Sequence, residues 1–86
     1  MKATLLKREG NKSLYSLDEQ LSTEEAFEVK YVIVSTAYHL FIPGGSETNI
    51  FPANKDGEII DWGELWGTRP SMGHDEAVKV FLEANN

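Results

Sequence analysis

The run "EVKYVIVSTAYHLFI", residues 28–42, constrains the fold more than any other segment of the chain. Its β-branched part, Val29–Val34, favours extended backbone, and apolar residues there fall on both alternating faces. This pattern is typical of a central strand that is covered on both sides. We predict that the strand stops at Pro43 and that its length requires a bulge or bend near Ser35–Ala37.

Two shorter β-compatible runs precede this strand, at about Ala3–Glu9 and Lys12–Leu17. Gly10-Asn11 separates them, and both residues tolerate the positive φ that a two-residue hairpin turn demands. Ser22 and Glu25 then have the spacing of a capping box, which predicts one or two turns of helix.

Three further β signals follow the central strand. "PGGSE" lacks the lysine and spacing of a phosphate-binding loop and is typical of a turn between strands. Thr48–Pro52 is predicted as a strand, and "NKDG" as a second turn in which Gly57 supplies the left-handed residue. "EII", residues 58–60, is predicted as a short last strand.

The C-terminal "HDEAVKVFLEANN" predicts a helix of about three turns. Asp75 and Glu76 favour the positive end of its dipole, and Asp75 is placed to pair with Lys79 four residues later. The helix has an apolar stripe that must pack against the sheet, formed by Ala77, Val78, Phe81 and Leu82. We therefore expect one α+β domain, residues 1–86: an antiparallel sheet of four to five strands with this helix on one face.

Charge is distributed unevenly along the chain. Residues 1–12 carry a net charge of +3, residues 13–86 carry −9, and the total is −6. A protein this acidic repels nucleic-acid phosphates, whereas a basic protein surface would be attracted to it. Solubility alone also explains such a charge. The chain has no cysteine, which fits a reducing cytosol.

No segment has the features of a signal peptide or a membrane span. The most apolar run, Tyr31–Ile42, is 12 residues long, and a spanning helix needs about 20. We expect a cytoplasmic protein.

The segment "DWGELWGTRP", residues 61–70, contains the leading candidates for a contact surface. Asp61 can cap a helical turn that would place Trp62 and Trp66 on one side. The two indoles then either fill a thin core or form an exposed aromatic pair that docks into a partner. Trp and Arg are enriched among residues that carry binding energy. The predicted protein-binding residues are Asp61, Trp62, Glu64, Trp66 and Arg69.

Two alternatives remain open. A small-molecule or nucleotide site is one, and its residues would be Tyr38, His39, Gly44 and Gly45. A small hydrolase centred on His74 is the other, with Ser71 nearby in sequence, although no nucleophile elbow is present.

We expect no metal or cofactor. Two histidines without a third clustered ligand make a poor zinc site. The carboxylates Asp56, Glu58, Asp61 and Glu64 lack the alternation of a calcium loop. With so little clustered chemistry, we expect no catalytic activity.

Residues 46–78 contain a pattern formed by Glu47, Thr48, Phe51, Pro52, Ala53, Asp56, Gly57, Asp61, Trp62, Glu64, Leu65 and His74. With this pattern the segment resembles a set of small phage proteins of no established activity. "YVIVSTA" is also similar, whereas Trp66 departs from the pattern. The resemblance implies a phage or prophage origin and brings no catalytic residues.

The sequence therefore predicts a non-enzymatic phage accessory protein that binds a host or phage protein. Its partner could be a basic, nucleic-acid-binding one, and the accessory protein would inhibit a defence or nucleic-acid enzyme through its acidic surface. We expect no direct contact with nucleic acid or membrane, and a homo-oligomer stays open.

Overall fold

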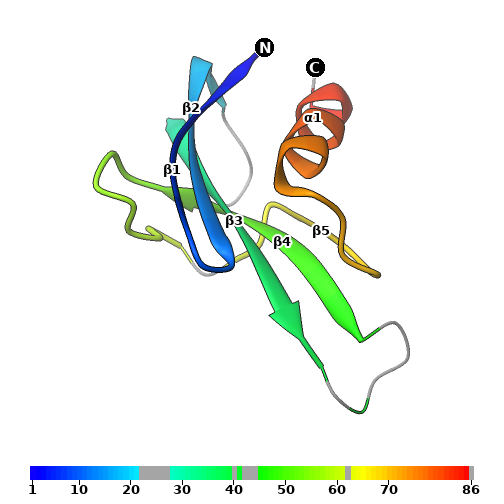
Figure 1. The fold of residues 1–86 in the computed structure, drawn as a ribbon. Coiled ribbons are helices and arrows are strands. Elements are labelled where there is room, and N and C mark those ends of the chain that lie inside the picture. The colour runs from blue at the N-terminus through cyan, green and yellow to red at the C-terminus, as the bar shows by residue number, and fades with distance from the viewer. Residues whose placement is uncertain (22–27, 40, 42–44, 62, 86) are drawn as a thin grey trace.

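In the computed structural model the chain forms a five-stranded antiparallel sheet with one helix packed against it (Figure 1). The structure describes residues 1–21, 28–39, 41, 45–61 and 63–85. Its elements are β1 (Ala3–Glu9), β2 (Lys12–Leu21), β3 (Val29–Tyr38), β4 (Ser46–Ala53), β5 (Trp66–Thr68) and α1 (His74–Ala84). The strands lie side by side in chain order, β1-β2-β3-β4-β5. The predicted α+β fold is confirmed.

The central strand β3 is covered on both faces, as its sequence predicts. Val32 and Val34 are fully buried in the main core, which includes the apolar stripe of α1. Ile33 points the other way and packs with Leu14 and Ala53 in a smaller cluster. The sheet therefore has a thick core under the helix and a thin one on its opposite face.

The helix α1 buries the four residues predicted for its apolar stripe: Ala77, Val78, Phe81 and Leu82. It begins at His74 with Gly73 as its N-cap, and Asp75 and Glu76 lie in the first turn. The helix covers the sheet above β3 and β4, while the far end of the β3–β4 hairpin extends beyond it (Figure 1).

The predicted bulge near Ser35–Ala37 is wrong. β3 pairs with β4 over eight consecutive residues, from Tyr31 opposite Ala53 to Tyr38 opposite Ser46. This unbroken ladder pairs the N–H and C=O groups along the β4-facing edge of the long strand, so no bulge is needed. The irregularities lie instead in β1, between Leu5 and Lys7, and in β2, between Ser16 and Leu21.

The first hairpin turn forms where it is predicted, but only Gly10 of its two residues adopts a positive φ, +57°. Asn11 is held by β3 instead. Its carbonyl accepts the Thr36 N–H at 3.0 Å, and its side-chain amide donates to the Thr36 carbonyl at 2.6 Å. The helical turn predicted at Ser22–Glu25 lies outside the described residues.

The last strand is not where the sequence predicts it. Residues 58–60 contribute only an isolated bridge, Ile59 opposite Ala53, and β5 begins at Trp66. The helical turn predicted after Asp61 is also wrong. Leu65 donates its N–H to the Ile50 carbonyl at 2.7 Å, because the outer edge of β4 needs backbone partners.

The turn after β4 contains Gly57, which has a φ of +83°. Residues with a Cβ atom rarely adopt this φ, so we expect a substitution here to be destabilising. Gly57→Ala should lower the free energy of unfolding by about 1 kcal/mol. Gly57→Asn is the matched control, because asparagine tolerates the left-handed region and should recover part of the loss. Urea denaturation measures the free energy of unfolding of both variants. An alanine variant as stable as the wild type would show that the positive φ does not require glycine.

Candidate functional site

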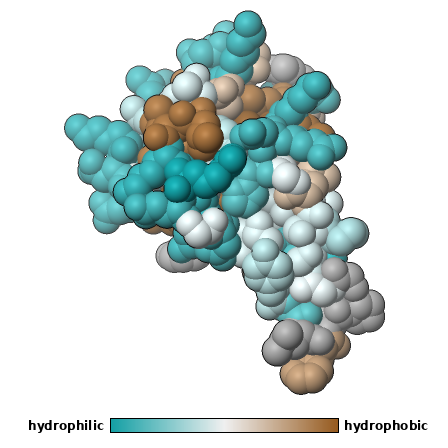
Figure 2. Space-filling model, viewed as in Figure 1, coloured by the Kyte–Doolittle hydropathy of each residue, from teal (hydrophilic) through white to brown (hydrophobic). Residues whose placement is uncertain are grey.

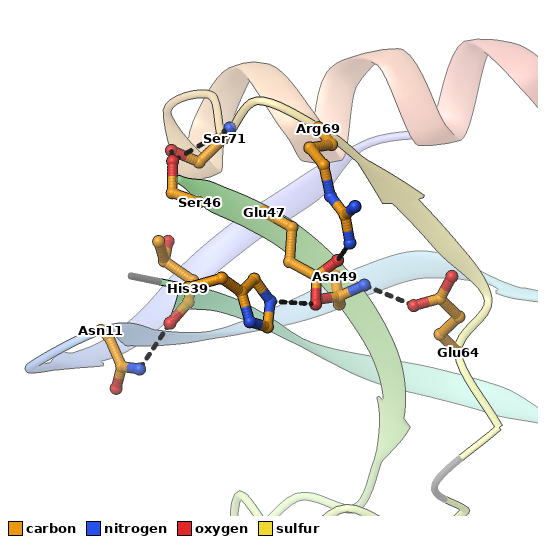
Figure 3. A network of polar contacts seen from close by, with 9 residues as sticks. Asn11, His39, Ser46, Glu47, Asn49, Glu64, Arg69 and Ser71 are labelled. Carbon is orange, nitrogen blue, oxygen red and sulfur yellow. Dashed lines mark hydrogen bonds and ion pairs between the residues drawn. The ribbon is translucent and has the colours of Figure 1, made fainter. Parts of the chain in front are cut away.

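The outer edge of β4 carries a polar cluster centred on Glu47 (Figure 3). His39 Nε2 lies 3.0 Å from Glu47 Oε1, and the Arg69 guanidinium donates to Glu47 Oε2 at 3.1 Å. The hydrogen bond from His39 and the one from Arg69 hold the pKa of the Glu47 carboxyl below its usual range. The cluster therefore joins His39 and Arg69, which the sequence assigns to two different sites.

Beside this cluster, Glu64 accepts a hydrogen bond from the Asn49 side-chain amide (Figure 3). Gly67 lies against the pair, and a Cβ there would meet Asn49 Nδ2 at 2.9 Å. The glycine thus allows β5 to approach the Asn49–Glu64 contact. A shallow hollow of about 310 Å³ results, lined by Glu47, Asn49, Glu64, Gly67, Thr68 and Arg69.

The segment before β5 runs along β4 and exposes the side chains of Glu58 and Glu64. Ile60 donates its N–H to the Pro52 carbonyl at 3.0 Å, which fixes the segment to the strand. The Ile60 side chain is 53% exposed. We call Glu58, Ile60, Asp61 and Glu64 the acidic edge. Within the described part of the chain, none of its three carboxylates forms an ion pair.

The predicted protein-binding residues divide into three groups. Glu64 and Arg69 are exposed and flank the hollow. Asp61 is half-buried, and its carboxylate accepts the Gly63 N–H at 2.9 Å, so it shapes its own loop. Trp66 is half-buried in β5 and packs against the main core, whereas Trp62 lies outside the described residues.

Of the alternative ligand-binding residues that the structure describes, Tyr38 and His39 point apart. Tyr38 is 74% exposed, while the His39 ring is half-buried against Glu47. Consecutive residues of an extended chain point in opposite directions. Gly45 is exposed with a φ of +65°, and its carbonyl accepts the His39 N–H at 2.8 Å. Gly44 lies outside the described residues.

His74 belongs to a second polar cluster, between α1 and the sheet. Its Nδ1 lies 2.6 Å from Ser13 Oγ, and its Nε2 lies 2.8 Å from Thr36 Oγ1. Burial lowers the pKa of the His74 imidazole, and the positive charge of Arg8 lowers it further. Ser71, the serine close to His74 in sequence, bonds instead to Ser46 at 2.7 Å.

Asp75 completes this second cluster and does not pair with Lys79 as predicted. Its carboxylate accepts the Tyr15 hydroxyl at 2.5 Å and the Arg8 guanidinium at 3.1 Å. The Tyr15 bond, followed by Arg8, lowers the pKa of Asp75, whereas burial raises the pKa of Tyr15 to about 12. These contacts draw Asp75 toward β1 and β2.

The Ser13–His74 contact has the chemistry of a nucleophile and a base, but its position limits what it can do. Ser13 is only 1% exposed, so its hydroxyl cannot reach a substrate without opening the helix–sheet junction. Arg8 Nε also donates to the same hydroxyl at 2.9 Å. The geometry is that of a buried connection between α1, β2 and β3.

Two further findings concern cofactors and membranes. Among the described residues, no three His, Asp or Glu side chains are grouped to hold a metal ion. In the same part of the chain, no helix has the length and apolar character needed to cross a bilayer.

Comparison with protein-family models, with curated proteins and with solved structures gave no match for this chain.

Several residues of both clusters were not predicted as site residues. Glu47 and Asn49 lie in β4, where polar and apolar residues alternate as in many strands. Only the pairing of β4 with β5 brings their side chains close to Arg69 and Glu64. Ser13 and Thr36 meet His74 across 61 and 38 residues of chain. No local spacing signals such contacts, because strand register and helix docking create them.

Proposed function

We propose that this protein is a non-enzymatic phage accessory protein that binds a basic protein surface through its acidic edge. The observation that carries the proposal is the exposed Ile60 beside Asp61, with Glu58 and Glu64 on the same edge of the sheet. An apolar anchor surrounded by carboxylates suits a partner with an apolar pocket and basic rim. The net charge of −6 favours encounter with such a partner.

The phage assignment rests on the sequence resemblance of residues 46–78, which includes Asp61 and Glu64 of this edge. Proteins that process nucleic acid carry basic surfaces for phosphate, and an acidic protein can occupy them. We therefore propose a host defence or nucleic-acid enzyme in the bacterial cytoplasm as the partner, with inhibition as the outcome.

Affinity capture from bacterial host extract tests this proposal. The test variant, Asp61→Asn with Glu64→Gln, removes two charges but keeps oxygen atoms that can accept the bonds from Gly63 and Asn49. The matched control, Glu19→Gln with Glu76→Gln, changes two exposed carboxylates elsewhere on the surface. Both variants have the same net charge.

The captured protein should be recovered about tenfold less with the test variant than with the wild type, since two charged contacts at its interface are lost. The control should retain nearly all of it. Equal loss with both variants would show that binding follows net charge alone. No loss with either variant would show that the acidic edge is not part of the interface.

A further inference from the structure

A groove lies between the edge strand β1 and the helix α1, at the side of the sheet opposite β5. Its volume is about 470 Å³. Apolar side chains from both elements line it, among them Ala3, Leu5, Val78 and Leu82. Figure 2 shows hydrophobic surface over β1, surrounded by hydrophilic residues. Leu5 and Leu6 there are 42% and 50% exposed.

Among the described residues no strand pairs with the outer edge of β1, which offers backbone groups beside this groove. Asp18 donates its N–H to the Lys2 carbonyl at 3.0 Å, which makes Ala3 and Leu17 a non-hydrogen-bonded pair. In this register the N–H and C=O groups of Ala3 and Leu5 point away from β2. Their side chains face α1, on the same side of the sheet as Tyr15 and Leu17.

The bulge between Leu5 and Lys7 limits how far another strand could pair. Bulges at sheet edges interrupt pairing, so the available edge ends at Leu5. This leaves a short stretch of open backbone, which lies alongside the apolar groove.

Two lysines and two carboxylates line the groove. The lysines are Lys2, directly before β1, and Lys79 of α1, and residues 1–12 carry a net charge of +3. Of the two carboxylates, Asp75 is already bound by Arg8 and Tyr15, which leaves Glu83 against the two lysines. An occupant with negative charge is therefore favoured over a positive one.

We propose that the β1–α1 groove binds an extended acidic segment of a partner protein, which adds as a strand to β1. Its backbone would pair with Ala3 and Leu5, its alternate apolar side chains would enter the groove, and its carboxylates would meet Lys2 and Lys79. A second copy of this chain is disfavoured as occupant. Symmetric pairing of two β1 strands would bring their basic residues together.

This site is distinct from the acidic edge, which lies across the sheet and would attract a partner of opposite charge. The two proposals can therefore fail independently.

The probe is a labelled octapeptide of alternating valine and glutamate, with blocked ends. Its counterpart has lysine in place of glutamate. Fluorescence anisotropy should show the glutamate peptide binding at least about tenfold more tightly. Amide resonances of Ala3 and Leu5 should shift on titration, and a backbone N-methylated glutamate peptide should lose binding, because strand addition needs peptide N–H groups.

Two protein variants locate the site. Ala3→Pro removes an outward N–H without removing a bond to β2, so it should abolish binding while circular dichroism remains that of a folded sheet. Lys79→Glu should weaken binding about tenfold. Lys55→Glu, a charge change in the exposed turn after β4, should leave binding unchanged.

Equal affinity for the two peptides, or no binding of either at about 1 mM, would overturn the proposal. Amide shifts confined to other strands would overturn it as well. A dimer in light scattering that Ala3→Pro converts to monomer would assign the groove to a second copy instead.

Discussion

Replacing Phe81 with alanine should lower the free energy of unfolding by about 3–5 kcal/mol. The side chain is 1% exposed and lies in the core between α1 and the sheet. Its loss removes apolar contacts and leaves a cavity that the surrounding strands can close only in part. A chain of 86 residues has a total stability of roughly 4–13 kcal/mol, so this loss is a large fraction of the whole.

Urea denaturation followed by circular dichroism measures this effect. Val80→Ala is the matched control, because Val80 lies on the same helix but is 36% exposed. It should cost less than about 1 kcal/mol. Similar losses for the two variants would mean that α1 does not dock on the sheet through the stripe that contains Phe81.

The sequence predicts this docking because the stripe repeats with helical spacing and the helix is too short to be stable alone. Four of the five strands are likewise recognisable from β-branched runs and glycine turns. β5 is different. Trp66, Gly67 and Thr68 have no strand pattern of their own, and they pair because the edge of β4 offers unpaired backbone. Tertiary context decides that element, and local propensity does not.

The second large effect concerns pH. His74 has a lowered pKa in the folded protein, because burial and Arg8 disfavour the charged imidazole. An unfolded chain has a histidine pKa near 6.5 and binds the proton more readily. The stabilising contribution of neutral His74 is therefore fully present above about pH 6.5, and it is lost as the pH falls through the lowered value.

The free energy of unfolding should accordingly decrease between pH 7 and pH 5. Asp75 and Glu47 also have lowered pKa values, but their contributions are lost only as the pH falls below the ordinary carboxyl range. His74→Gln should make the profile flatter, since glutamine does not titrate. His39 is present in both proteins, so the difference between the two profiles reports His74 alone.

Removing the imidazole altogether should be more damaging. His74→Ala leaves the buried Ser13 hydroxyl and the Thr36 hydroxyl without their shared partner and should cost about 1–3 kcal/mol at pH 7. His74→Gln should cost less, because its amide can bond to one of the two. Parallel pH profiles for the wild type and His74→Gln would contradict this account of the cluster.

The sequence predicts less of the candidate site than of the fold. Glu64 and Arg69 are predicted contact residues that the structure places at one hollow. The sequence does not decide whether Trp66 fills the core or forms a contact surface, and in the structure its side chain packs partly into the core. No sequence signal predicts that Glu47 links His39 to Arg69, because this role depends on which strands become neighbours.

We propose that the acidic edge binds its partner by charge. The most direct test is the dissociation constant of the purified complex with the captured protein, measured by calorimetry at about 50 and 200 mM salt. We expect affinity to fall with salt for the wild type and for Glu19→Gln with Glu76→Gln. Asp61→Asn with Glu64→Gln should bind more weakly and respond less to salt. A dissociation constant that is the same at both salt concentrations, and the same for all three proteins, would contradict the account.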